Sequence, residues 1–202
     1  MEDSFMVTIK IILGSRRPGR FGIQPAAWIT ELGAQYADKA RFELVDLQEL
    51  DLPFLDESVP ASMNGGVYEH EHSQKWSKIV DEADGFIFVS PEYNHSYSPT
   101  LKNAIDYLYR EWNYKPVSFV NYGAAAGGVY STEHLRNVAA WLKMYDLSEQ
   151  LFIPHYYNNM DENGAFKFDE DHERRAKALI EQNIFWAEAM KPAREALKTQ
   201  EQ

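Results

Sequence analysis

The sequence predicts a single doubly wound α/β domain, and three observations carry this prediction. Strand-like and helix-like patterns alternate along all 202 residues, and they form five strand–helix pairs. No internal repeat, low-complexity block or flexible linker interrupts them, which is typical of one parallel sheet covered by helices on both faces. The hydrophobic share of 45% and the charged share of 25% are those of an ordinary globular protein. We therefore expect one domain over residues 1–202, with its core at about 7–190 and a mobile C-terminal tail.

Five short runs rich in apolar residues predict the strands. Most of them are bounded by glycine or proline, as buried strands often are. In chain order they are residues 7–13, 42–47, 85–89, 117–122 and 151–153. An irregular stretch at residues 51–66 separates the second strand from the helix that follows it.

Apolar residues spaced three or four positions apart predict the helices. Pro25 is tolerable only near the first turn of the first helix. Ser98 and Pro99 mark the start of the third, because serine caps free N–H groups and proline is favoured at the first helical position. The predicted apolar stripes are Ile23, Ala27, Leu32 and Tyr36; Trp76, Ile79 and Val80; Leu101, Ile105 and Leu108; Leu135, Val138, Ala139 and Leu142; and Ala176, Leu179, Ile180 and Ile184.

Charge and composition exclude several classes of protein. With 31 Asp+Glu against 20 Lys+Arg, the net charge of −11 repels nucleic acids and anionic membranes. The chain contains no cysteine, which excludes a disulfide scaffold, a thiolate metal site and a cysteine nucleophile. No stretch reaches the roughly 18 apolar residues of a membrane span, and the acidic N-terminus does not resemble a secretory signal. We expect a cytoplasmic protein with no nucleic-acid or membrane partner.

The loop after the first strand is basic and rich in glycine, and ligands of such sheets bind beyond the carboxyl ends of the strands. Arg16, Arg17 and Arg20 lie there beside Ser15 and three glycines. Hydroxyl and guanidinium groups donate to phosphates, and glycine allows close backbone approach. A solvated basic turn is the other interpretation that composition leaves open. The loop lacks both the P-loop ending and G-x-G-x-x-G spacing, which favours a monophosphate ligand.

Two more loops follow the third and fourth strands and so lie at the same sheet edge. Residues 90–99 are polar and aromatic, and such a loop offers oriented N–H groups and a flat face for a planar ring. A rigid connector, with Tyr93 packed on the sheet edge, is the alternative. Residues 123–128 are all glycine or alanine, so an approaching ligand meets backbone. Small residues in that loop can equally serve packing.

Six short motifs along the chain form a specific combination. They are Gly14-Ser15-x-Arg17, Ala83-Asp84-Gly85, Pro91-Glu92-Tyr93-Asn94, Leu101-Lys102-Asn103-Ala104-Ile105-Asp106, Lys115-Pro116 and Gly127-Gly128. Taken together, these motifs resemble the NADPH-dependent FMN reductase family from about Val7 to Ile153. The resemblance implies a flavodoxin-like fold with a five-stranded parallel sheet, non-covalently held FMN, and NADPH or NADH as co-substrate for two-electron reduction of an acceptor.

The resemblance also implies site residues, position by position. Those that would hold the FMN phosphate are Ser15, Arg17 and Arg20, with the N–H groups of Gly22 and Ile23. Those that would run along the isoalloxazine ring or close its other edge are Pro91, Glu92, Tyr93 and Asn94, then Gly123, Gly127 and Gly128. Arg20 and His95 depart from the family pattern, which commonly has a small hydroxyl residue and a glycine there. We assign no catalytic residue, because hydride passes directly between stacked rings.

Three functions fit these features to different degrees. An oxidoreductase acting on a quinone, an azo compound, a metal oxyanion or free flavin is favoured by the Pro-Glu-Tyr-Asn and Leu-Lys-Asn-Ala-Ile-Asp motifs. The alternatives are a flavodoxin-type electron carrier and a flavin-binding redox sensor without substantial turnover. The resemblance further implies a homodimer or homotetramer. Tyr107, Tyr109, Trp112 and Tyr114 form an aromatic cluster that either core packing or such an interface would explain. Glu69-His70-Glu71-His72 is interpreted as a solvated charged loop, so no metal site is predicted.

Overall fold

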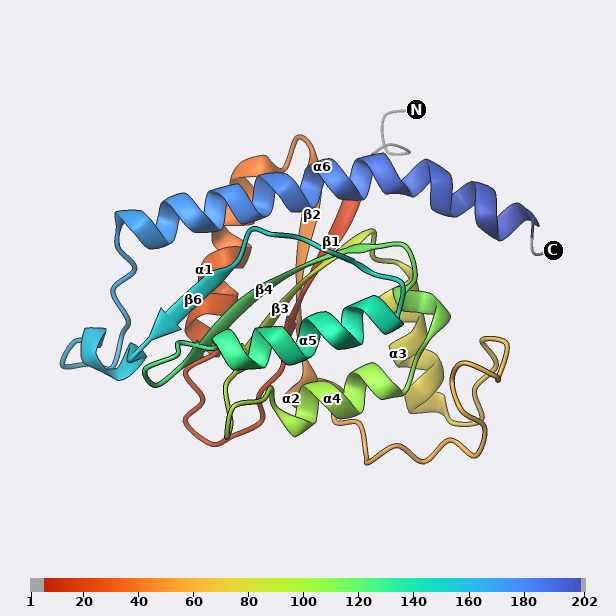
Figure 1. Cartoon of the computed structure of the whole chain (residues 1–202), viewed down its shortest axis with the longest axis horizontal. Helices are drawn as coiled ribbons and strands as arrows, with labels where there is room; N and C mark the ends of the chain where they lie inside the picture. Colours follow the sequence, from red (N-terminus) through yellow and green to blue (C-terminus); the bar gives the residue numbers. More distant parts are fainter. Residues whose placement is uncertain (1–5, 201–202) are drawn as a thin grey trace.

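The computed structural model of the chain describes residues 6–200 and contains a twisted parallel sheet (Figure 1). Its strand order is β2-β1-β3-β4-β5, and β6 also pairs with β4. The strands are β1 (Val7–Leu13), β2 (Ala40–Asp46), β3 (Gly85–Pro91), β4 (Pro116–Gly123), β5 (Tyr145–Asp146) and β6 (Leu151–Pro154). This order is that of flavodoxin-like folds, so the predicted fold class is confirmed.

The last position in the sheet is filled by two short strands instead of the one predicted. β5 pairs with the start of β4, and β6 pairs with its end from Val120 onward. Residues between them leave the ladder, so the fifth strand is split into two pieces. The split does not change the order of the sheet, because both pieces run parallel to β4.

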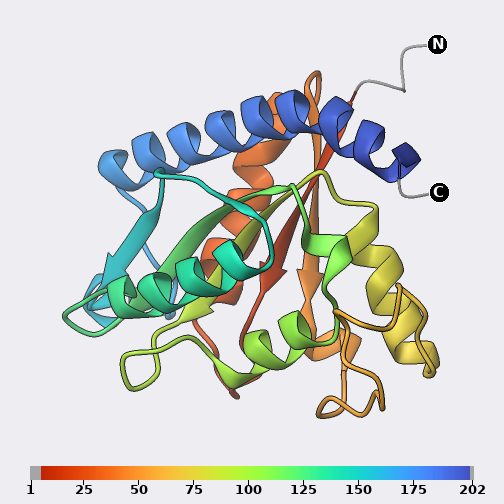
Figure 2. The same cartoon turned by 45° about the vertical axis from the view of Figure 1, so that its right-hand side comes forward.

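Helices cover both faces of the sheet (Figure 2). One hydrophobic core joins the sheet to α1 (Ile23–Gly33) and α6 (Glu170–Gln200). The other joins it to α3 (Glu71–Asp81), α4 (Pro99–Asp106) and α5 (Val129–Trp141), while the single turn α2 (Leu47–Leu50) follows β2. Although α6 has 31 residues, neither it nor any other helix within residues 6–200 is apolar enough to cross a membrane.

The buried face of α1 differs from the predicted one. Ile23 and Ala27 are exposed, and the residues that pack on the sheet are Pro25, Ala26, Ile29, Leu32 and Gly33. Leu32 is buried as predicted, and Tyr36 packs against the same core, so the prediction is wrong only for Ile23 and Ala27. In the predicted stripes that begin at Trp76, Leu135 and Ala176, every residue is buried except Ile79 and Val138, which are partly buried and pack against the second core.

The start of α4 is built as its sequence predicts. The Ser98 hydroxyl accepts a hydrogen bond from the Leu101 N–H at 3.1 Å, and Pro99 is the first helical residue. The same hydroxyl donates to the Gly14 carbonyl. It thereby joins the beginning of α4 to the loop after β1, which brings two of the predicted site loops into contact.

The structure decides between the two explanations of the aromatic cluster for two of its residues. Tyr107 and Trp112 are fully buried in the second core, so core packing accounts for them. In the segment 69–72, Glu69 precedes α3, His70 is its N-cap, and Glu71 and His72 lie in its first turn, with His72 Nε2 2.9 Å from Asp56. No group of three or more metal-binding side chains occurs among the described residues.

The end of α6 is tied to the sheet beyond residue 190. Asp84, just before β3, accepts from Lys191 Nζ at 3.1 Å and from the Arg194 guanidinium. It also accepts the Thr8 N–H at 3.0 Å. The single domain over residues 1–202 and the mobile tail remain predictions, and residues 201 and 202 lie outside the described part.

Candidate functional site

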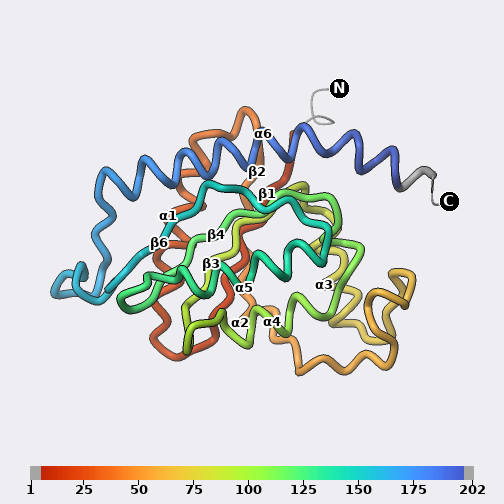
Figure 3. Tube along the Cα trace, in the orientation of Figure 1, coloured from red at the N-terminus to blue at the C-terminus, as the bar shows by residue number. Residues whose placement is uncertain are grey.

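The loops after β1, β3 and β4 leave the sheet at one edge (Figure 3) and converge on a cavity of about 190 Å³. The segment after β6 completes its wall. The lining residues are Ser15, Arg17, Arg20, Phe21, Pro91, Glu92, Tyr93, Tyr122, Gly123, Ala124, Tyr156 and Tyr157. Seven of the twelve predicted site residues are therefore brought together here. The other five, which lie next to them in the same loops, do not line the cavity: Gly22, Ile23, Asn94, Gly127 and Gly128.

One end of the cavity can accept an anion. Ser15 is buried, and its hydroxyl lies 3.5 Å from that of Tyr93. Arg17 is exposed and has no ion-pair partner within residues 6–200; the Tyr156 hydroxyl beside its guanidinium raises the pKa of Arg17. The N-terminus of α1 has no side-chain cap and no acidic residue in its first turn. Its helix dipole therefore adds to the positive field of Arg17.

Arg20 is held in an internal ion pair. Its guanidinium donates two hydrogen bonds to the Asp46 carboxylate and one, of 2.6 Å, to the Ser15 carbonyl. Both side chains of the pair are only about one-tenth exposed. Arg20 thus fixes the loop after β1 to the end of β2, and its predicted contact with a phosphate remains a prediction.

Tyr122 occupies a position beside the start of α1 that the sequence did not reveal. The Gly22 N–H donates to its buried hydroxyl, and Ser15 also bonds to it. A Cβ on Gly22 would lie 2.5 Å from that hydroxyl, so only glycine fits without a shift. Burial raises the pKa of Tyr122, which keeps the phenol protonated near neutral pH. A phosphate contact by the Gly22 N–H remains a prediction.

The loop after β3 is a tight turn with an unusual backbone. Tyr93 and Ser96 exchange two backbone hydrogen bonds of 2.7 and 3.0 Å. Asn94 and His95 between them have φ values of 50° and 66°, as in a type I′ turn. Asparagine tolerates this left-handed conformation, whereas histidine adopts it less readily than glycine.

Three contacts fix this turn to α5. The Glu92 carboxylate accepts the Tyr130 N–H at 3.0 Å and so caps the helix N-terminus. The His95 ring stacks on that of Tyr130, with centroids 4.3 Å apart. His134 Nδ1 lies 2.9 Å from the Ser96 hydroxyl. The Glu92 carboxylate is therefore engaged at the start of α5. The predicted contact of residue 92 with a flavin ring would be made by its backbone, and it remains a prediction.

The glycine loop is packed tightly against its neighbours. Gly127 and Gly128 have φ values of 63° and 104°. A Cβ on Gly128 would lie 2.4 Å from the Asn121 Cβ, and one on Gly127 would lie 2.8 Å from the Pro154 nitrogen. A Cβ on Gly123 would lie 3.1 Å from the Glu92 Cβ. These glycines are needed for the close approach of the loops, and their predicted contact with a ring edge is compatible with this role.

An aromatic cluster on the cavity wall was missed by the sequence analysis. Phe21 stacks on Tyr156 with ring centroids 4.3 Å apart, and it meets Tyr122 edge-on at 5.0 Å. Tyr157 lies beside Tyr156 at 5.5 Å. Tyr156 and Tyr157 closely follow the last predicted strand, so the rule that sites follow strand ends could have found them.

The site therefore combines an anion-accepting end with a ring-accepting wall. Arg17, the Ser15 hydroxyl and the start of α1 favour a phosphate group. Bare glycine and alanine backbone and aromatic side chains favour a planar ring next to it. A planar molecule that carries a phosphate, as FMN does, fits this donor set.

Comparisons with known proteins agree with this chemistry. Residues 7–158 match the family described as NADPH-dependent FMN reductase. The chain is 41% identical over 136 residues to an NAD(P)H-dependent FMN reductase of Schizosaccharomyces pombe, covering 67% of both chains. It is 30% identical over 183 residues to an NAD(P)H:quinone oxidoreductase of Solanum tuberosum, covering 87% of this chain and 90% of that one.

Solved structures show the same fold at low sequence identity. A flavoenzyme NAD(P)H:(acceptor) oxidoreductase from Paracoccus denitrificans superposes with a TM-score of 0.70 at 20% identity. The superposition covers 92% of this chain and 99% of that one. At this identity the similarity concerns the fold alone.

Proposed function

The chain belongs to the NADPH-dependent FMN reductase family, and we propose that it reduces a small-molecule acceptor with electrons from NADPH or NADH. The observation that carries the proposal is the convergence of Ser15, Arg17 and the uncapped start of α1 with the loops 91–94 and 123–128 on one cavity. The chemistry that FMN supplies when bound is acceptance of a hydride from the nicotinamide and release of electrons to the acceptor.

In this proposal the residues of the chain bind and orient. Arg17 and Ser15 hold the phosphate by charge-assisted hydrogen bonds. The loops 91–94 and 123–128 flank the ring with backbone, and Phe21 and Tyr156 shield the wall between them from water. Neither Tyr122 nor Glu92 on the cavity wall acts as a general base, because Tyr122 stays protonated and the Glu92 carboxylate is engaged at the start of α5.

A quinone is the first acceptor class within the proposal, because the Solanum tuberosum relative is named a quinone oxidoreductase. Azo compounds, metal oxyanions and free flavin are the other acceptors within the proposal. The proposal also includes a cytoplasmic location and assembly as a homodimer or homotetramer. A flavodoxin-type carrier or a redox sensor without substantial turnover is the competing function.

Anaerobic mixing with a nicotinamide separates these functions. We expect NADPH or NADH to bleach the flavin absorbance of the FMN-loaded protein within about a second, because turnover numbers of enzymes are typically 1–10³ s⁻¹. Addition of a benzoquinone should then restore the oxidised spectrum. The measurement is stopped-flow absorbance with each nicotinamide in turn. Absence of bleaching over minutes with both would instead indicate a carrier or a sensor.

A further inference from the structure

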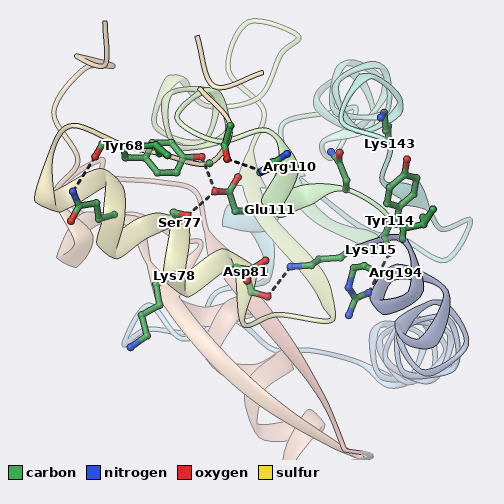
Figure 4. Close-up of a pocket in the computed structure, with 16 residues that line it drawn as sticks. Tyr68, Ser77, Lys78, Asp81, Arg110, Glu111, Tyr114, Lys115, Lys143 and Arg194 are labelled. Carbon is green, nitrogen blue, oxygen red and sulfur yellow. Dashed lines mark hydrogen bonds between the residues drawn. The ribbon is translucent and has the colours of Figure 1, made fainter. Parts of the chain in front are cut away.

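A second and larger cavity (Figure 4), of about 730 Å³, is lined by residues at the other end of the sheet from the candidate FMN site. Lys115, on its wall, directly precedes β4, whereas Gly123 ends that strand at the FMN site. An eight-residue strand spans about 26 Å, so the two cavities are separate. The volume lies in the range of pockets that enclose small organic ligands.

The walls of this cavity are cationic although the chain is acidic. Five lysine or arginine side chains line it, against two carboxylates. Some of these cations are held by the chain itself: Lys115 Nζ donates to the Val80 and Asp81 carbonyls, and Arg194 pairs with Asp84. In a protein with a net charge of −11, such a local reversal of sign favours an anionic ligand.

Two cations on the wall have no carboxylate partner within residues 6–200. Arg110 is exposed and donates to the Gly65 carbonyl at 2.7 Å. Lys143 is also exposed, and its ammonium lies 5.6 Å from the centre of the Tyr114 ring. Both groups can therefore pair with a ligand without breaking an ion pair of the chain.

One oxygen of a buried carboxylate on the same wall has no hydrogen-bond partner among the described residues. Glu111 Oε1 accepts from the Tyr68 hydroxyl at 2.7 Å and from the Ser77 hydroxyl at 2.6 Å. Oε2 is buried and has no hydrogen-bond partner in the described part of the chain. An unpaired buried acceptor costs free energy, and a donor on a ligand would remove that cost.

The backbone of the wall is also strained where the cations lie. Tyr114 and Lys143 have φ values of 59° and 54°, and the Tyr114 N–H donates to the Lys143 carbonyl at 2.9 Å. Left-handed conformations are unfavourable for residues other than glycine and gather at functional sites. Here the strain places a ring and an ammonium group side by side on the cavity wall (Figure 4).

We propose that this cavity binds an organic anion of about mononucleotide size. Its anionic group, phosphate or carboxylate, contacts Arg110 and Lys143. Its hydrogen-bond donor reaches Glu111, and a planar part packs near Tyr114. The proposal concerns a site separate from that of FMN, so it does not depend on the proposed redox function.

Titration calorimetry on protein saturated with FMN tests this site, with adenosine 5′-monophosphate and citrate as the two probes. We expect saturable binding of at least one probe. Arg110→Ala combined with Lys143→Ala should weaken that binding at least tenfold. The control variant, Lys39→Ala combined with Lys167→Ala, removes the same charge from exposed positions elsewhere, and it should change the affinity for the probe less than twofold. Binding of citrate alone would identify a carboxylate ligand, and binding of the nucleotide alone would identify a phosphate ligand.

Three results would overturn the proposal. The first is that neither probe binds. The second is that the two double variants have the same affinity for the probe, whether that affinity equals the wild-type value or lies below it. The third is that the nucleotide displaces FMN, measured as a rise of free-flavin fluorescence in the same sample, because it would then occupy the flavin site. Failure of the protein to take up FMN would count against the proposed function alone, and the titration would then use the protein without it.

Discussion

Replacing Gly128 with alanine lowers the free energy of unfolding by about 2–5 kcal/mol. Gly128 has a φ of 104°, and a left-handed conformation costs a residue with a Cβ about 1–2 kcal/mol. The new Cβ would also lie 2.4 Å from the Asn121 Cβ and 2.7 Å from its carbonyl carbon. Relief of such overlap by movement of packed backbone costs about 1–3 kcal/mol more. Urea unfolding followed by circular dichroism measures the loss.

Gly164→Ala is the matched control for this variant. Gly164 also has a positive φ, of 77°, but a Cβ there would meet no atom within 4 Å. Replacement of Gly164 should therefore lower the free energy of unfolding only by the cost of the left-handed backbone conformation, about 1–2 kcal/mol. Equal losses in the two variants would show that the close packing of Gly128 against β4 does not contribute to stability.

Arg17→Ala is expected to weaken FMN binding by about 10- to 150-fold. The guanidinium is exposed, lacks an ion-pair partner in residues 6–200, and lies at the anion-accepting end of the cavity. A hydrogen bond to a charged group contributes about 1.5–3 kcal/mol, which corresponds to this range. Quenching of flavin fluorescence during titration of the protein without cofactor gives the dissociation constant.

Arg16→Ala provides the control next to it in the chain. Arg16 pairs with Asp51 in an ion pair whose side chains are 40% and 73% exposed. Exposed pairs contribute about 0–1 kcal/mol, so FMN affinity should fall less than about fivefold. If the two variants bind FMN equally well, Arg17 is not a phosphate ligand.

The sequence sufficed to predict the elements whose signals are local. The buried strand 85–89 and the Ser98–Pro99 helix start depend on neighbouring residues, and the structure confirms both. The predicted site loops after β1, β3 and β4 also meet, because the carboxyl ends of parallel strands share one edge. Their individual contacts with FMN remain predictions.

Features that depend on distant partners could not be predicted in this way. Arg20 pairs with Asp46 across 26 positions, and the Tyr122 hydroxyl reaches Gly22 at the start of α1. Ile23 and Ala27 were wrongly predicted on the buried face of α1, because their spacing is helical but packing on the sheet selects neighbouring residues; Leu32 is buried as predicted. The split of the fifth strand likewise reflects its pairing with both ends of β4.

The identity of the flavin in the purified protein tests the central claim most directly. Denaturation of the protein, followed by chromatography and mass measurement of the released chromophore, should give FMN at about one molecule per chain. Colourless protein should bind added FMN to the same ratio. Release of FAD in place of FMN, or a protein that binds no FMN even in excess, would contradict the proposed site.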